Sequence, residues 1–169
     1  MRRILLTGMS GTGKSTVIGE LAARGYRAVD LDCDEFSEWV ASSGNADTVG
    51  STVEPERDWL WREDRIQTLL STEDADVLFL GGCAANMGMF LPLFDHVVLL
   101  SAPAATIVER LRTRNTNSYG KNPVEAARVL HLIETVEPLL RRAADAEIDT
   151  RIDLTQVVAT LLQLAQSPK

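Results

Sequence analysis

The chain has 169 residues, of which 45% are apolar and 24% are charged, and its formal net charge is −7. This length and apolar content predict one globular domain over residues 1–169, and the absence of a Lys/Arg cluster argues against a nucleic-acid-binding surface. No apolar run approaches the roughly 20 residues that span a bilayer, so we expect a cytoplasmic protein that contacts no membrane.

Short apolar runs rich in Val, Ile and Leu alternate along the chain with segments of helical periodicity. This alternation predicts an α/β fold in which helices cover both faces of a parallel sheet. Apolar residues recur at helical spacing over 104–111 and 154–165. The expected strands are 3–7, 27–31, 77–80, 97–100 and, from a weaker pattern, 147–149. The expected loops are 44–52, 84–89 and 114–123.

A glycine-rich segment follows the first expected strand directly and precedes a helical pattern. It matches G-x-x-x-x-G-K-[ST], a motif whose backbone N–H groups surround phosphate oxygens at a helix N-terminus. In this motif the lysine reaches the β- and γ-phosphates and the next hydroxyl binds Mg²⁺, which assigns these roles to Lys14 and Ser15. The expected nucleotide-binding residues here are Gly8, Met9, Ser10, Gly11, Thr12, Gly13, Lys14, Ser15 and Thr16.

Three aspartates alternate after the second expected strand, in the segment VDLDCDEF. In an extended conformation Asp30, Asp32 and Asp34 share one face. Clustered carboxylates repel one another unless a cation or a substrate hydroxyl lies between them. A helix N-cap at Asp32 or Asp34 is compatible with this interpretation.

Residues 54–71 have a helical pattern, and one arginine falls on its apolar face. The apolar stripe consists of Trp59, Ile66, Leu69 and Leu70. Arg62 lies within this stripe, where a guanidinium needs a partner. Either an acid such as Glu63 pairs with Arg62, or the arginine points into a cleft and holds a polar or anionic ligand.

Glycines and cations mark two further candidate segments. Gly81 and Gly82 end the third expected strand, at the edge of the sheet where α/β folds bind ligands. A tight strand-to-helix turn is the alternative reason for this pair. Arg114 and Lys121 flank a polar loop, and either cation could stabilise charge on a transferring phosphoryl group while the loop excludes water.

The segments GMSGTGKST, DLDCDEF, WRED, LFLGG and VEPLLRRA, in this order, resemble the shikimate-kinase-like branch of the adenylate-kinase superfamily. The resemblance implies a P-loop NTPase three-layer sandwich, with helices on both faces of a five-stranded parallel sheet of order 2-3-1-4-5. It also implies an acceptor-binding region at about 34–72 and a short lid at about 112–123.

The same resemblance implies roles for individual residues. Asp32 supports Mg²⁺, and Asp34 binds the acceptor hydroxyl or takes its proton; a register with Asp30 and Asp32 in these roles stays open. Arg62, which follows an aromatic residue, binds the acceptor. Arg110 resembles an arginine that stacks on adenine.

Two positions depart from the pattern of the family. Similar kinases have a glycine run that touches the acceptor, but Cys83 replaces the third glycine after Gly81 and Gly82. Val136 stands where an arginine helps to hold shikimate. Because this change removes a charge-assisted contact typically worth about 1.5–3 kcal/mol, we expect an acceptor other than shikimate.

Together these features predict an ATP-dependent phosphotransferase that moves the γ-phosphoryl group to a small polar metabolite, an alcohol or a phosphate. ATP and Mg²⁺ are the expected cofactors, and the protein is expected to be a monomer or a homodimer. The expected catalytic residues are Lys14, Asp34, Arg114 and Lys121. The alternative is a nucleotide-binding module or an NTPase without a small-molecule acceptor.

Overall fold

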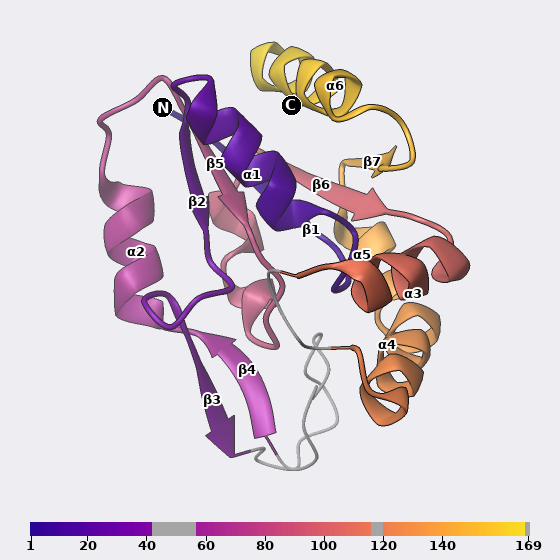
Figure 1. Cartoon of the computed structure of the whole chain (residues 1–169). Helices are drawn as coiled ribbons and strands as arrows, with labels where there is room; N and C mark the ends of the chain where they lie inside the picture. Colours follow the sequence, from indigo (N-terminus) through magenta and orange to yellow (C-terminus); the bar gives the residue numbers. More distant parts are fainter. Residues whose placement is uncertain (42–56, 116–119, 168–169) are drawn as a thin grey trace.

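The computed structural model describes residues 1–41, 57–115 and 120–167. At its centre lies a five-stranded parallel sheet of order β2-β5-β1-β6-β7 (Figure 1). The strands of this sheet are β1 (Arg2–Thr7), β2 (Arg27–Asp30), β5 (Val77–Gly81), β6 (His96–Ser101) and β7 (Ala146–Asp149). Numbered within the sheet alone, this is the order 2-3-1-4-5, so the sequence prediction is confirmed.

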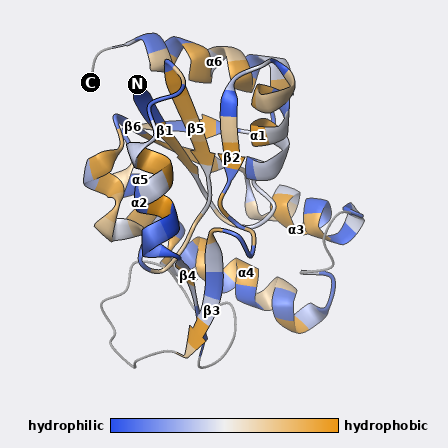
Figure 2. Ribbon diagram, turned by 90° about the vertical axis from the view of Figure 1, so that its left-hand side faces the viewer, coloured by the Kyte–Doolittle hydropathy of each residue, from blue (hydrophilic) through white to orange (hydrophobic). Residues whose placement is uncertain are grey.

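Helices cover both faces of the sheet, because successive strand residues point to opposite sides. The covering helices are α1 (Lys14–Ala23), α2 (Glu63–Ser71), α5 (Glu137–Ala143) and α6 (Leu154–Gln166). On one face, Ile4 and Leu6 share an apolar cluster with residues of α1 and α6. On the other face, Leu5 shares a cluster with residues of α2 and α5. Figure 2 shows the apolar strand β5 between these two helical layers.

Two further helices lie beyond the carboxyl end of β6 (Figure 1). They are α3 (Ala104–Thr113) and α4 (Pro123–Thr135). Ile107 and Leu111 of α3 meet Val129 of α4 in a small apolar cluster. This contact holds α3 against α4; α3 contains Arg110 and is followed directly by Arg114, two of the predicted cations.

Residues 57–61 form a strand, so the helix predicted over 54–71 is wrong at these residues. β4 (Arg57–Trp61) pairs antiparallel with β3 (Ser37–Ala41), and Trp39 lies opposite Trp59. Their ring centroids are 4.9 Å apart, and aromatic cross-strand pairs of this kind stabilise a hairpin. Residues 54–56 lie outside the described residues.

The expected loops have different outcomes. The loop predicted at 44–52 lies outside the described residues. Residues 84–89 contain a turn and the short 3-10 helix η1 (Met87–Met89), which η2 (Leu91–Leu93) follows. In the loop predicted at 114–123, α3 ends at residue 113 and α4 begins at residue 123, close to the predicted bounds, and residues 116–119 lie outside the described residues.

In the described part of the chain, no helix is both long and apolar enough to cross a bilayer.

Candidate functional site

The glycine-rich loop between β1 and α1 needs its glycines for steric reasons. A Cβ on Gly8 would lie 2.3 Å from the carbonyl oxygen of Leu100 in β6, and Gly13 has a φ of 97° directly before α1. The hydroxyl of Thr12, which is fully buried, donates to the Met9 carbonyl at 2.8 Å. The loop is therefore held close to the sheet and leads straight into the N-terminus of α1, as an anion-binding loop requires.

Lys14 and Asp32 meet beneath this loop. The Lys14 ammonium donates to the Gly8 carbonyl at 2.8 Å and lies 3.5 Å from Asp32 Oδ2, while the Cys83 N–H donates to Asp32 Oδ1 at 3.1 Å. Burial raises the pKa of Asp32, and Lys14 opposes that shift. The Asp32 side chain is still 29% exposed, so water in the open cleft moderates the shift. Burial also raises the pKa of the Cys83 thiol.

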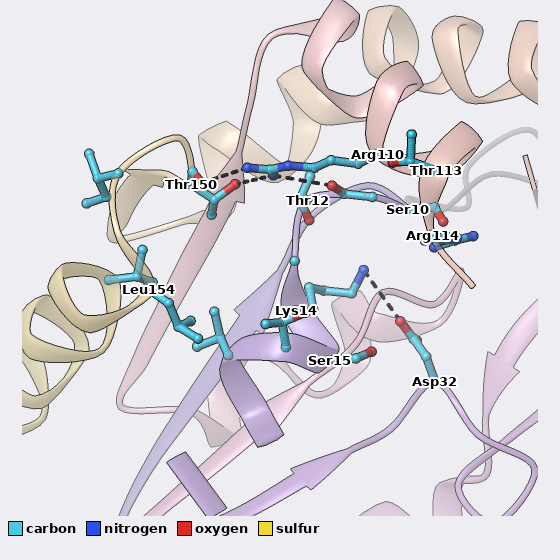
Figure 3. A pocket seen from close by; sticks show the side chains of 16 residues that line it. Ser10, Thr12, Lys14, Ser15, Asp32, Arg110, Thr113, Arg114, Thr150 and Leu154 are labelled. Atoms are coloured by element: carbon cyan, nitrogen blue, oxygen red, sulfur yellow. Dashed lines mark hydrogen bonds and ion pairs between the residues drawn. The ribbon is translucent and has the colours of Figure 1, made fainter. Parts of the chain in front are cut away.

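An open cleft of ≈ 720 Å³ extends from this pair to the start of α6, a volume typical of ligand sites. Figure 3 shows Lys14, Ser15 and Asp32 close together at one end of the cleft, and Arg110 reaching Thr150 at the other. Arg110 donates to Thr150 Oγ1 at 2.8 Å and to the Thr150 carbonyl at 2.7 Å. The cleft therefore joins the glycine-rich loop to a fixed guanidinium.

Most of the nucleotide-binding residues predicted from sequence line this cleft. They are residues 10–16, Asp32, Arg110 and Arg114. Gly8 and Met9 are buried at the base of the loop. The other predicted residues are not among those that line the cleft: Asp34, Arg62, Gly81, Gly82 and Lys121.

The three alternating aspartates do not share the face of one strand, which corrects the prediction. β2 ends at Asp30, whose Oδ1 accepts the N–H of Asp32 at 3.0 Å. Asp32 and the exposed Asp34 follow in a turn, which brings Asp32 to the cleft. Strand β3 comes next rather than a helix, so the N-cap interpretation is wrong.

The two glycines at the end of β5, Gly81 in the strand and Gly82 directly after it, serve packing, which supports the structural interpretation of this pair. A Cβ on Gly81 would lie 2.6 Å from Ile18 Cγ1 of α1. A Cβ on Gly82 would lie 3.0 Å from Leu31 Cβ and 3.2 Å from the indole of Trp61. Side chains from both faces of the sheet therefore approach this turn closely.

Arg62 has an acidic partner, but the partner is Glu38 rather than Glu63. Arg62 is the residue before α2, and its Nη1 lies 3.3 Å from Glu38 Oε2 on β3. Asn86, which the sequence analysis did not single out, joins the same region: its side chain accepts the N–H of Trp61 and donates to the Trp61 carbonyl, both at 2.8 Å. The segment after β5 is thus hydrogen-bonded to β4.

Comparison with known proteins identifies the family. The AAA domain family matches residues 4–131. A shikimate kinase of Syntrophus aciditrophicus is 30% identical over 187 aligned residues, covering 99% of this chain and 93% of its own length. A shikimate kinase of Neisseria gonorrhoeae is 28% identical over 165 residues, covering 95% and 94%. The chain belongs to the AAA domain family and is a P-loop kinase of the shikimate and adenylate kinase-like group.

A solved structure agrees with this fold. Shikimate kinase from Acinetobacter baumannii in complex with shikimate matches 97% of this P-loop kinase, and 92% of its own chain, with a TM-score of 0.62 and 23% identity. The predicted family, kinase class and ATP-binding loop are therefore confirmed, and the acceptor is the open point.

Sequence reasoning missed the part of the cleft formed after β7. In this P-loop kinase, Thr150, Ile152 and Leu154 line the cleft opposite Arg110. The segment after a sheet-edge strand has no fixed motif, although its place at the carboxyl end of the sheet is a general signal. Of the two cysteines, Cys33 is exposed and Cys83 is half-buried.

Proposed function

We propose that this P-loop kinase transfers the γ-phosphoryl group of ATP to a hydroxyl of a small polar metabolite. The bond between the γ-phosphorus and the bridging oxygen of ADP breaks, and a bond to the acceptor oxygen forms. The proton of the acceptor hydroxyl passes to Asp34. The observation that carries the proposal is that the glycine-rich loop, Lys14, Asp32 and Arg110 line one and the same cleft.

The nucleotide half of this proposal rests on groups that suit a triphosphate and a base. The loop amides and the N-terminus of α1 favour phosphate oxygens, and Lys14 is close enough to exchange its bond with the Gly8 carbonyl for one with a phosphate. Arg110 is held by Thr150, so its flat guanidinium is available for stacking on adenine. Ile152, which is 43% exposed, offers an apolar contact for the base.

Magnesium fits the oxygen donors at the other end of the cleft. The hydroxyl of Ser15 and the carboxylate of Asp32 both line it (Figure 3), and Mg²⁺ in kinases usually takes one or two protein ligands besides phosphate oxygens. In the described ranges no three His, Cys, Asp or Glu side chains are grouped to hold a metal, in keeping with an ion that the nucleotide helps to bind. When bound, the ion neutralises charge on the β- and γ-phosphates.

For the acceptor half we propose Asp34 as the group that orients or deprotonates the hydroxyl, and Arg62 as an anchor beside Gly81 and Gly82. Asp30 is engaged by the N–H of Asp32, which supports the Asp32/Asp34 register. The acceptor region is proposed at about 34–72.

A cation beside the transferring group completes the proposed site. Arg114 lines the cleft at the end of α3, and Lys121 is exposed before α4; one of the two would stabilise phosphoryl charge from a lid at about 112–123. These parts are proposed to act within one domain, residues 1–169.

The test is transfer itself. The protein is incubated with Mg-ATP and a library of hydroxylated metabolites, and we expect one compound to raise ADP formation and to gain the mass of a phosphate. Asp34→Asn should abolish transfer to that compound while ATP binding, measured by calorimetry, persists. Normal transfer by this variant would remove Asp34 from the mechanism, and no heat with ATP and Mg²⁺ would refute the whole proposal.

Two other functions predict different results. An NTPase would release ADP at a rate that no metabolite changes. A binding module would retain ATP or a metabolite without forming ADP. Lys14→Ala weakens nucleotide binding in all three cases, so it does not separate them.

A further inference from the structure

The arginine proposed as the acceptor anchor already has a negatively charged neighbour. Arg62 Nη1 lies 3.3 Å from Glu38 Oε2, and the two side chains are 37% and 47% exposed. Glu38 is fixed on β3 opposite Leu60, two residues before Arg62. A carboxylate ligand at Arg62 would therefore have to displace Glu38 or lie beside it, and like charges at close range repel.

The surroundings of this pair are acidic. In the described segments 30–41 and 57–65, eight carboxylates stand against three arginines. Val136 stands where the kinases that this chain resembles have an arginine. It is 7% exposed and belongs to the apolar cluster that contains Trp61. No second cation at that position offsets the charge of an anionic ligand, so the local charge disfavours an anion.

The β3–β4 hairpin also carries a pair of aromatic side chains. Trp39 and Trp59 are half-buried cross-strand neighbours with ring centroids 4.9 Å apart, and Trp59 also contacts the apolar cluster around Trp61. Because side chains alternate along a strand, this tryptophan pair lies on the opposite face of the β3–β4 hairpin from Glu38, and the ligand beside the Arg62–Glu38 pair meets polar groups instead.

Two buried donors nearby lack acceptors. Trp61 is 1% exposed, and neither its Nε1–H nor the Nε–H of Arg62 has a hydrogen-bond partner among the described residues. Trp61 Nε1 faces the turn at Gly82, 3.2 Å from the position of a Cβ there. Because unpaired buried donors are costly, each of these two N–H groups favours a ligand that brings an oxygen acceptor to it.

We propose that the acceptor of this kinase is a polyhydroxylated compound without a negative charge, such as a sugar, a cyclitol or an amino derivative of either. The inference rests on the proposed kinase function, since it names the class of molecule bound beside Arg62. The Arg62–Glu38 pair offers both donors and acceptors, which can bind neighbouring hydroxyls of one molecule, whereas a carboxylate would compete with Glu38.

The experiment measures binding by tryptophan fluorescence in the absence of nucleotide, with probes that differ in charge. The probes are shikimate with its methyl ester, and glucuronate with glucose and glucosamine. We expect at least one uncharged or cationic probe to bind more tightly than its carboxylate counterpart. In Glu38→Gln, which frees Arg62, the carboxylates should gain about two- to fivefold in affinity, the range of an exposed ion pair, and the uncharged probes should change less.

A matched control is Glu20→Gln, which breaks the Glu20–Arg24 pair on α1, where both side chains are 34% exposed; it should leave every affinity unchanged. The proposal is overturned if each carboxylate binds more tightly than its counterparts, if no uncharged or cationic probe binds, or if Glu38→Gln leaves the carboxylates unaffected. Binding needs no ATP, so success here with no phosphoryl transfer would refute the kinase proposal alone.

Discussion

Asn86→Ala removes two hydrogen bonds that connect the segment after β5 to β4, and leaves the backbone bond from the Ala85 N–H to the Trp59 carbonyl. The Asn86 side chain bonds both the N–H and the carbonyl of Trp61 at 2.8 Å, and Trp61 is almost fully buried. At a net value of about 0.5–1.5 kcal/mol for each hydrogen bond, the variant should lose about 1–3 kcal/mol in its free energy of unfolding. For a protein of this size that loss lowers the Tm by about 2–12 °C.

Urea unfolding followed by tryptophan fluorescence measures the loss, and calorimetry measures the Tm. Asn86→Asp keeps an oxygen for the Trp61 N–H but loses the donor to its carbonyl, so an intermediate stability is expected. The control is Asn122→Ala, which removes one N-cap bond to the Glu125 N–H at 2.9 Å, worth about 1 kcal/mol. If Asn86→Ala is as stable as wild type while the control loses about 1 kcal/mol as expected, the two bonds contribute nothing and the reasoning is refuted.

Two other substitutions test the nucleotide half. Gly8→Ala places a Cβ 2.3 Å from the Leu100 carbonyl, so the soluble yield and the Tm of this variant should fall sharply. The control is Gly19→Ala, which has open space in α1 and should be neutral or stabilising by up to about 1 kcal/mol. Equal effects of the two substitutions would contradict this reasoning. Because burial raises the pKa of Asp32, ionising this carboxyl costs stability as the pH rises above 3.8. Asp32→Asn should therefore unfold at higher urea than wild type at pH 7 and show no such gain below pH 3.8, and a gain independent of pH would rule out this cause.

The nucleotide loop could be predicted from sequence because its determinants are local. Gly8, Gly13 and Lys14 act within one short segment between a strand and a helix, and the backbone itself supplies the binding groups. The alternation of apolar strands with helices likewise predicted a parallel sheet covered on both faces, while the order of its strands followed from the resemblance to the kinase family. Even here the contact that makes Gly8 necessary comes from Leu100, far along the chain, and no local pattern contains it.

The acceptor half could not be predicted in the same way. A helical wheel places Trp59 beside Ile66, yet Trp59 belongs to a strand because its partner is Trp39, twenty residues earlier. Short apolar runs fit both periodicities, and only the pairing decides between them. The same pairing brings Glu38 to Arg62, so an incorrect helix also hid the partner of the predicted anchor.

The two halves of the site consequently differ in how freely their chemistry can change. The phosphate side is built from backbone groups of one loop, so most substitutions there alter the loop itself. The proposed acceptor side consists of side chains of β3, β4 and the residues beside them, and Asn86 attaches β4 to the segment after β5. That segment is connected to the phosphate side by the hydrogen bond from the Cys83 N–H to Asp32. Because the donor is a backbone group, most substitutions at residue 83 would leave this bond in place. In the proposed site, replacing Glu38 therefore changes the charge met by the acceptor while leaving Lys14 and Asp32 in place, and this separation is why membership of the kinase family does not determine the acceptor.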